Sequence, residues 1–306
     1  MRRNTFQNIS RAGHVCAVFV VLGILLALNA FSASPDPLPR FSIGFSIKSF
    51  PDVDAKDANA AIKLWAAEIA AQAKMQPESA VYGDMKIMLA DFNKERIDFI
   101  SIPTVDFFRN EALLLGSHGY IGVRKGKKTE RYVILSAADN KLGNLLLLKK
   151  RKLAVVLQDD IGVLFLNTLL LRQHQPEMDQ FFSAIDSKPK HSQAIYAVFF
   201  GSADACVVPE RLFNTMAEMN PQVGKKLKVL AASADLVTAV SIYRKEYPQT
   251  LRGKMDLIAL NFKNYPRGKQ ILTLFQVEDL AVMNDKDLAE MRNLFREYKR
   301  LKGKLL

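Results

Sequence analysis

The chain has 306 residues, a formal net charge of +12, two cysteines and four histidines. No two histidines have the close spacing of a metal-binding pair, and no Gly-x-Ser-x-Gly motif is present. The sequence therefore excludes the common metal-dependent and serine hydrolases. We expect a protein that is not an enzyme and that uses no cofactor and no metal.

The first 33 residues have the composition of a secretory signal. Three arginines precede an uncharged stretch whose apolar core is 15–28, and small residues follow it. This order is typical of export, so we expect 1–33 to be a signal peptide and the protein to be periplasmic. An uncleaved membrane anchor stays open, although the core is shorter than the ~20 residues of a spanning helix. The small residues offer cleavage after Ala30, Ala33 or Ser34.

Loss of the signal changes the composition of the mature chain. The three arginines leave with it and lower the net charge from +12 to +9, and Cys206 becomes the one remaining cysteine. A single cysteine cannot form an internal disulfide, so in an oxidising compartment the fold depends on its core. Export also excludes nucleic acid as a partner, despite the basic charge.

Roughly 270 mature residues exceed the usual size of a single core, so we expect two lobes. Strand-like apolar runs alternate with helix-like amphipathic runs, a pattern that predicts parallel α/β sheets. The expected strands are 41–47, 79–82, 97–100, 132–135, 153–157, 203–208 and 237–243. The expected helices are 57–74, 85–94, 161–173, 250–260, 268–275 and 285–302.

A ligand-binding edge is predicted at 97–104. The apolar strand 97–100 is followed by Ser101, and Pro103 suits the first turn of the helix that comes next. Open α/β sheets bind small ligands beyond the carboxyl ends of their strands, and helix N-termini hold anions there. Ser101 and Thr104 therefore have two compatible interpretations, as helix caps and as donors to a ligand.

Four segments occur in an order and spacing that are typical of one protein family. They are Asn93–Phe99, Tyr132–Val156, His191–Ala194 with Ala203–Ala205, and Tyr243–Lys245. On these segments the chain resembles the exported solute-binding proteins of the phosphate/phosphonate-type ABC transporter family. The resemblance runs from about Phe41 to Leu280.

The resemblance implies the two-lobe α/β fold of periplasmic binding proteins. Each lobe would be a mostly parallel sheet flanked by helices, with the ligand in the cleft between the lobes. Lobe 1 would comprise 41–124 and 238–306, and lobe 2 would comprise 125–237. The protein would act as a monomer that binds a small-molecule solute, closes on it by a hinge motion and presents it to a membrane permease.

The resemblance fails at the anion site. Phosphonate-binding members of the family have a Ser-Thr-Ser-Gly turn at a helix start, which surrounds the phosphonate oxygens with hydroxyl and N–H groups. The aligned residues here are Asp159, Asp160, Ile161 and Gly162, and two carboxylates would repel a dianion. They would instead cap the helix, or favour a cationic or hydroxyl-rich ligand. We expect the family fold with an altered anion site.

The residues expected to bind the ligand include His191, which matches a histidine of the family. An imidazolium that donates to the ligand would make binding weaken between about pH 6 and 8. A solvated histidine at a helix start is the alternative. The full expected set is Ser46, Ser101, Thr104, Asp159, Asp160 and His191.

The altered site leaves a second functional class open. A periplasmic module of the same fold could sense a ligand and signal to a membrane-bound sensor protein. An uncleaved anchor would favour this alternative over import.

Two basic segments have ordinary interpretations. Gly122–Thr129 superficially resembles a phosphate-binding loop, but it has one residue too few between its glycines, so we interpret it as a solvated basic turn near a lobe crossing. The run Arg292–Lys304 alternates apolar and charged residues, which indicates a docked helix with a solvated face.

Overall fold

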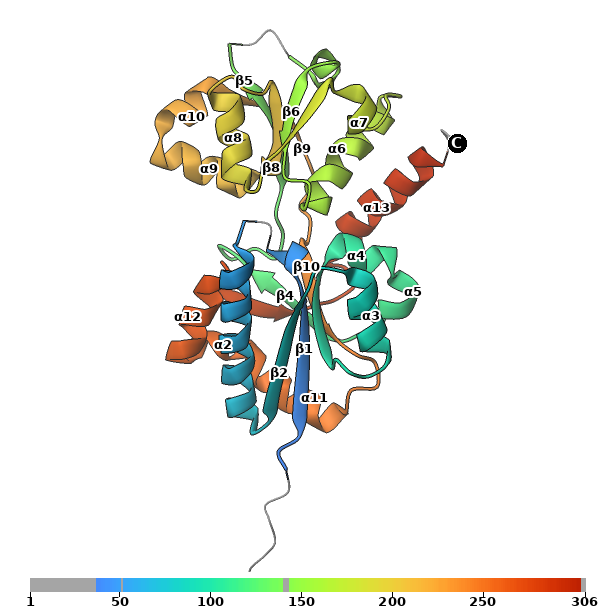
Figure 1. Cartoon of the computed structure of the whole chain (residues 1–306), viewed down its shortest axis with the longest axis vertical. Coiled ribbons are helices and arrows are strands. Elements are labelled where there is room, and N and C mark those ends of the chain that lie inside the picture. The colour runs from blue at the N-terminus through green and yellow to red at the C-terminus, as the bar shows by residue number, and fades with distance from the viewer. Residues whose placement is uncertain (1–36, 51, 140–142, 304–306) are drawn as a thin grey trace, which may run out of the picture. The chain divides into compact units, whose positions relative to one another are not determined.

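The computed structural model describes residues 37–50, 52–139 and 143–303, so the expected signal peptide lies outside the described residues. From Arg40 onward the chain forms one compact unit with two sheets, each flanked by helices (Figure 1). The expected α/β class with two lobes is confirmed. In the ranges just given, no helix combines the length and the apolar character needed to cross a membrane.

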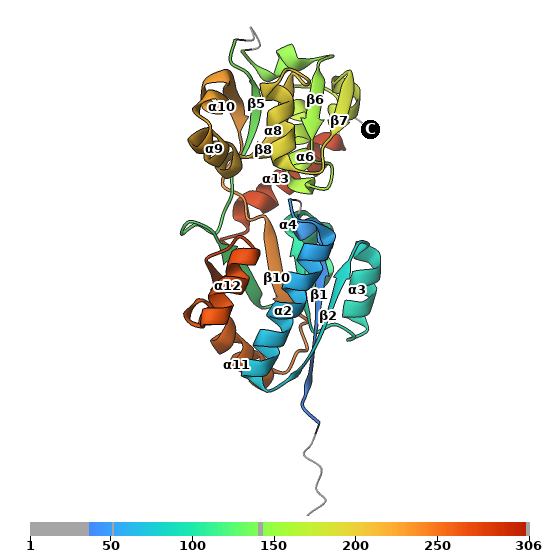
Figure 2. The ribbon, with the colours of Figure 1, turned by 60° about the vertical axis from the view of Figure 1, so that its left-hand side comes forward.

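Lobe 1 is built on a six-stranded sheet with the order β11-β4-β10-β3-β1-β2. Its strands are β1 (Arg40–Ser46), β2 (Gln76–Tyr82), β3 (Phe99–Pro103), β4 (Gly119–Val123), β10 (Ala239–Tyr243) and β11 (Asp279–Val282). One face is covered by α2 (Ala55–Ala73), α11 (Gln249–Leu260) and α12 (Pro266–Leu274) (Figure 2). The other face is covered by α3 (Met85–Asn93), α4 (Thr104–Arg109) and α5 (Glu111–Leu114). Two short 3₁₀ helices, η1 (Ile47–Ser49) and η3 (Phe262–Asn264), complete the lobe.

Lobe 2 is built on a five-stranded sheet with the order β7-β6-β8-β5-β9. Its strands are β5 (Tyr132–Ala137), β6 (Lys152–Val155), β7 (Ala184–Ser187), β8 (Ala205–Pro209) and β9 (Leu227–Ala232). One face packs against α6 (Asp160–Arg172) and α7 (Met178–Phe181), and η2 (Leu145–Leu148) lies in the same core. The other face packs against α8 (His191–Phe199), α9 (Glu210–Met219) and α10 (Pro221–Lys226).

Strands in the interior of each sheet are largely apolar because helices cover both faces. All five residues of β3 and all five of β8 are buried. In β5, Val133 and Leu135 join the core beneath α8, whereas Ile134 joins the core beneath α6. Continuous apolar runs are expected where both faces of a sheet are covered, and this is why the sequence signals these strands clearly.

The sheets are mixed, and the prediction of mostly parallel sheets is wrong. Of the nine pairings between described strands, five are antiparallel. The cause is the crossing of the chain between the lobes. Strands β1 and β3 end at the edge that faces lobe 2, so β10, which returns from lobe 2, enters at that edge and runs in the opposite direction.

Two segments cross between the lobes, 124–131 and 233–238. They pair with each other at Glu130 and Leu236, whose backbone N–H groups each donate to the carbonyl of the other residue, at 2.8 and 2.9 Å. Hinges between lobes consist of a few loop or element-terminal residues, and both segments are of this kind. We call them the crossing segments.

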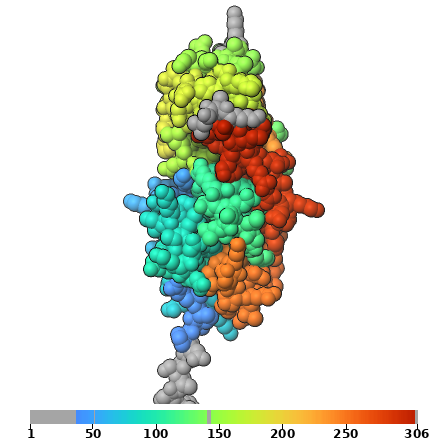
Figure 3. Space-filling model, turned by 90° about the vertical axis from the view of Figure 1, so that its right-hand side faces the viewer, coloured from blue at the N-terminus to red at the C-terminus, as the bar shows by residue number. Residues whose placement is uncertain are grey.

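The last helix, α13 (Ala289–Lys302), contacts both lobes. Its buried residues Met291, Leu294 and Phe295 share a core with Phe165 of α6 and Phe108 of α4. Figure 3 shows this C-terminal segment lying against residues of both lobes. The sequence analysis places 238–306 in lobe 1 alone, whereas α13 also packs against α6 of lobe 2. A helix that buries one apolar face and keeps a basic outer face can dock across a boundary, and α13 does so here.

Candidate functional site

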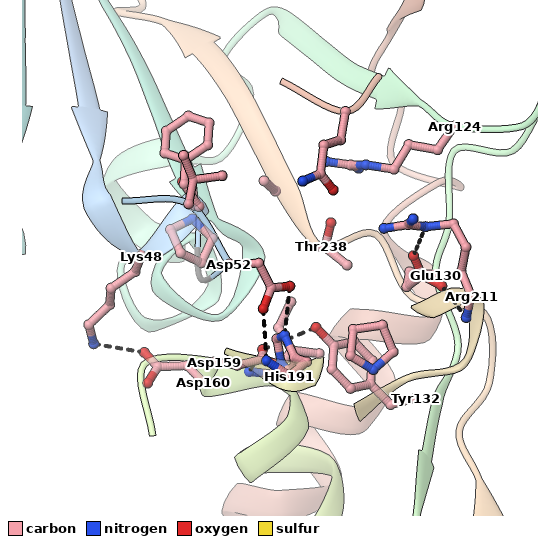
Figure 4. Close-up of a pocket in the computed structure, with 18 of the residues that line it drawn as sticks. Lys48, Asp52, Arg124, Glu130, Tyr132, Asp159, Asp160, His191, Arg211 and Thr238 are labelled. Carbon is pink, nitrogen blue, oxygen red and sulfur yellow. Dashed lines mark hydrogen bonds and ion pairs between the residues drawn. The ribbon is translucent and has the colours of Figure 1, made fainter. Parts of the chain in front are cut away.

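A cavity lies between the lobes, at the edge where β1, β3, β6 and β8 end (Figure 4). We call it the polar cavity, and its volume is about 750 Å³ when the part open to solvent is counted. Both lobes and both crossing segments contribute side chains to it. Its charged and hydrogen-bonding residues include Lys48, Asp52, Arg124, Glu130, Tyr132, Asp159, Asp160, His191, Arg211 and Thr238.

Asp159 precedes α6, and its carboxylate occupies the helix N-terminus. Oδ1 accepts hydrogen bonds from the backbone N–H groups of Ile161 and Gly162 at 3.2 and 3.3 Å, and from the hydroxyl of Tyr132 at 3.0 Å. Oδ2 lies 2.8 Å from Nε2 of His191. The prediction that Asp159 caps this helix is confirmed. Each of these donors is satisfied by a carboxylate of the chain itself.

His191 is held between carboxylates from opposite lobes. Nδ1 lies 2.8 Å from Oδ2 of Asp52 in lobe 1, and Nε2 lies 2.8 Å from Oδ2 of Asp159 in lobe 2. The backbone N–H of His191 donates to Oδ1 of Asp52, also at 2.8 Å. The residue is 1% exposed, so the alternative of a solvated histidine is wrong.

The two carboxylates determine the protonation of His191. Burial alone would lower its pKa, but the hydrogen bonds and charges of Asp159 and Asp52 outweigh burial and raise the pKa to about 9. Both ring nitrogens therefore donate, as an imidazolium. Burial opposes ionisation of Asp52 as well, yet the hydrogen bonds and charge of His191 hold the pKa of Asp52 below its usual 3.8. The expected loss of the imidazolium between about pH 6 and 8 is therefore corrected to a window near pH 9.

Asp160 joins the lobes through ion pairs. Its Oδ2 lies 3.0 Å from Nζ of Lys48 and 2.8 Å from Nη1 of Arg109, both in lobe 1. Arg109 also pairs with Asp106 of its own helix at 2.9 Å. The side chains of Lys48 and Arg109 are 35% and 49% exposed, so solvent weakens both pairs.

The three hydroxyl residues expected from lobe 1 do not line the polar cavity. The hydroxyl of Thr104 donates to the carbonyl of Val237 in a crossing segment at 2.6 Å, and Ser101 accepts from the hydroxyl of Ser241 at 3.0 Å. Ser46 is buried, whereas Ser101 lines a second cavity inside lobe 1. Neither Ser101 nor Thr104 caps α4, because Pro103 holds the N-cap position and no side chain bonds there. Their contact with a ligand stays a prediction.

Asp52 and Arg124 are not identified by the sequence. Lys125 and Lys127 are exposed, as expected of a solvated basic turn, but the side chain of Arg124 points into the cavity (Figure 4). The short apolar run of β4 directly before Arg124 is the signal that could have placed it at the edge of a sheet. Asp52 lies in the loop after η1, where no local pattern marks a site.

The carboxylates that line the polar cavity are paired with cationic side chains of the protein. In the part of the chain that the structure describes, no group of three or more His, Cys, Asp and Glu residues has the arrangement of a metal site.

Two lobes, a pair of crossing segments and a polar cavity between the lobes define a periplasmic type of solute-binding protein. The family described as "ABC transporter, phosphonate, periplasmic substrate-binding protein" matches residues 47–288, and the chain belongs to this family. The expected family is thus confirmed. Its members are transporter components that bind small solutes and interact with a membrane permease, and they are not an enzyme family.

Solved structures share the fold at low sequence identity. A binding protein component of an ABC phosphonate transporter from Pseudomonas aeruginosa is 13% identical, with a TM-score of 0.65 over 87% of this chain and 88% of its own. XAC2383 from Xanthomonas citri, solved with chloride, is 14% identical, with a TM-score of 0.67 over 86% and 99%. PhnD1 from Prochlorococcus marinus, solved with methylphosphonate, is 14% identical, with a TM-score of 0.64 over 85% and 98%. No curated protein matches the sequence.

Proposed function

We propose that the protein is an exported solute-binding component of an ABC transporter whose solute is neither phosphate nor a phosphonate. The observation that supports this proposal is the carboxylate of Asp159 at the start of α6. It accepts hydrogen bonds from two backbone N–H groups, a tyrosine hydroxyl and an imidazolium. Backbone N–H groups at a helix N-terminus, hydroxyls and cations are the donors that a phosphonate dianion needs.

Charge repulsion also disfavours a phosphonate at the start of α6. A dianion near the start of α6 would approach Asp159 and Asp160. At 4 Å and an effective dielectric constant of about 20, each pair of like unit charges costs about 4 kcal/mol. The positive charge of His191 does not offset this cost, because it is already shared between Asp52 and Asp159. A phosphonate would therefore have to displace a hydrogen-bonded carboxylate of the protein.

The hinge and the cavity suit delivery to a permease. The crossing segments pair at Glu130 and Leu236, and contacts between the lobes line the cavity, among them Asp52 with His191 and Lys48 with Asp160. A solute bound between the lobes adds contacts to the closed arrangement alone, and this difference shifts the population towards closure. A permease can then distinguish the loaded protein from the empty one.

A thermal-shift screen of the protein purified from the periplasm tests the proposal. The compounds are phosphate, methylphosphonate, amines, sugars, amino acids and organic acids. A solute at a hundred times its Kd stabilises the folded state by ~2.7 kcal/mol. We expect one class other than phosphonates to stabilise the protein, and millimolar phosphate and methylphosphonate to change little. Stabilisation by methylphosphonate alone contradicts the proposal.

The location of the protein tests the export step. We expect mature protein in the periplasmic fraction, with an N-terminus after Ala30, Ala33 or Ser34. Full-length protein in the cytoplasm contradicts export. Exported protein that keeps its first 33 residues and stays on the membrane favours the sensing alternative.

A further inference from the structure

A second cavity lies in lobe 1 beside the polar cavity. We call it the aromatic cavity, and its volume is about 760 Å³ when the part open to solvent is counted. The two cavities share lining residues, including Ser49, Phe50, Arg124 and Thr238, so they lie next to each other. The aromatic residues that line the second cavity are Phe45, Phe50, Trp65, Phe99, Tyr120 and Phe275.

The aromatic side chains support one another and form a fixed wall. Phe45 meets Trp65 edge-on with ring centroids 5.5 Å apart, and it stacks on Phe275 at 6.1 Å. Trp65 also stacks on Phe99 at 5.9 Å. Rings in mutual contact have few alternative rotamers, and their faces and edges attract an apolar or aromatic group. The wall suits a ligand with a bulky apolar body.

Arg124 lies where the two cavities meet. It begins a tight turn, in which Arg124 and Lys127 exchange backbone hydrogen bonds at 2.8 and 2.9 Å. The two central residues, Lys125 and Gly126, have φ of 46° and 72°, as a type I′ turn requires. The turn follows β4 directly, so the sheet fixes the position of Arg124 beside both cavities.

The guanidinium of Arg124 has no direct ion-pair partner within the described part of the chain. Among those residues it makes no side-chain hydrogen bond or ion pair. Burial, and then the positive charge of Arg211, lower the pKa of Arg124 below its usual range, although the negative charge of Glu130 acts in the opposite direction. A half-buried cation that forms no ion pair can gain one from an anion outside the chain, and this favours an anionic ligand at Arg124. The nearby Ser49 hydroxyl is likewise buried without a hydrogen-bond partner among the described residues.

The other charged residues of the two cavities are paired. His191 is the partner of Asp52 and Asp159, Lys48 is a partner of Asp160, and Arg211 lies 3.0 Å from Glu130. Lys128, the other cation of the aromatic cavity, lies 3.0 Å from Asp287. Of the described residues that line the aromatic cavity, none is acidic. Among the described cations that line the two cavities, Arg124 is therefore the one that forms no ion pair with a carboxylate of the chain.

We infer that the solute is an organic monoanion with an aromatic or other bulky apolar group, whose acid group binds Arg124 and whose apolar group fills the aromatic cavity. The inference rests on the proposed function and names its solute class. Ser49 donates to the acid group as well. A cationic solute has no free carboxylate to meet, and a hydroxyl-rich solute would face a wall of aromatic rings.

Calorimetric titration with matched compounds tests the inference. Phenylacetate and octanoate carry one negative charge and an apolar body. Phenylacetamide removes the charge, phenethylamine reverses it, and acetate removes the apolar body. We expect phenylacetate or octanoate to bind, and the three comparison compounds to bind at least about tenfold more weakly, since a charge-assisted hydrogen bond or a buried ring is lost.

Three variants separate the parts of the site. Arg124→Gln removes the charge, and we expect it to weaken binding by about tenfold to a hundredfold. Lys125→Gln removes the same charge from an exposed neighbour in the same turn, and we expect no change. Ser241→Leu adds volume inside the aromatic cavity, and we expect it to exclude the apolar body.

Two results overturn the inference while the solute-binding function stands. The first is phenylacetamide or phenethylamine binding as tightly as the two monoanions. The second is wild-type affinity in Arg124→Gln. Failure of both monoanions to bind also overturns the inference. The proposed function is then decided separately by the screen of other solute classes, which does not depend on Arg124.

Discussion

The carboxylate of Asp52 and the imidazole of His191 join the two lobes, with Oδ2 and Nδ1 2.8 Å apart. The same carboxylate accepts the backbone N–H of His191, the first residue of α8, at 2.8 Å. A helix N-terminus with a cationic side chain is a favourable place for an anion. Here a side chain of lobe 1 supplies that anion, so the contact acts as a clasp between the lobes at the polar cavity.

Replacement of Asp52 by Asn tests this clasp. The amide keeps the shape of the carboxylate but removes its charge and one acceptor oxygen. We expect Asp52→Asn to lower the free energy of unfolding by about 1–3 kcal/mol, as when one partner of a partly buried charged hydrogen bond is lost. Urea unfolding followed by circular dichroism measures the change.

The matched control for this variant is Asp57→Asn. Asp57 is exposed in the first turn of α2, and we expect its loss to change stability by less than about 0.5 kcal/mol. Equal stability of Asp52→Asn and Asp57→Asn would mean that the clasp contributes nothing.

Stability should depend on pH through His191. Its pKa is raised from 6.5 to about 9 in the folded state, so the stabilising contribution is fully present below pH 6.5 and is lost as the pH rises through 9. A shift of this size corresponds to roughly 3 kcal/mol. Asp52 acts in the other direction: because its folded pKa is lowered, its contribution is lost at acid pH, as the pH falls through that pKa.

Unfolding free energies between pH 5 and pH 9.5 measure the effect. We expect His191→Gln to flatten the decline above pH 6.5, and His174→Gln, an exposed histidine, to keep the wild-type profile. NMR titration of the His191 ring gives its pKa directly. A value near 6.5 would show that the ring does not hold its proton between Asp52 and Asp159.

The ion pairs of Asp160 should matter much less than the clasp. Lys48 is 35% exposed and pairs with Asp160 at 3.0 Å. Solvent-exposed pairs of this kind contribute about 0–1 kcal/mol. We therefore expect Lys48→Met to change the free energy of unfolding by less than about 1 kcal/mol at low salt, and by less still at high salt. A larger loss that persists in high salt contradicts this ranking.

Local signals in the sequence predicted much of the fold. The strand β3 was expected because its residues form a short apolar run. The helix α6 was expected because a capping aspartate directly precedes its apolar residues. Strand directions were predicted less well, because the effect of the crossing segments on β10 is not encoded in β10 itself.

The site was predicted where a local pattern or the family resemblance marks it. Asp159 was recognised because a cap and its helix are adjacent, and His191 because it matches a histidine of the family. Asp52 was missed, because it lies 139 residues from His191 and no periodic pattern relates the two. Arg124 is basic like its exposed neighbours Lys125 and Lys127, so residue type alone does not mark it as a site residue. Only its position directly after β4 distinguishes it from them. Contacts between distant loops depend on the whole fold, and a single sequence does not reveal them.

Calorimetric titration of methylphosphonate tests the central claim most directly, namely that Asp159 takes up the anion-binding donors of α6. The wild-type protein is compared with a variant in which Asp159, Asp160 and Ile161 become Ser, Thr and Ser. The variant with Asp179→Ser, an exposed acidic residue of α7, serves as the control. We expect no measurable heat of binding with the wild type and the control, and measurable affinity in the triple variant. Tight binding of methylphosphonate by the wild-type protein would contradict the claim.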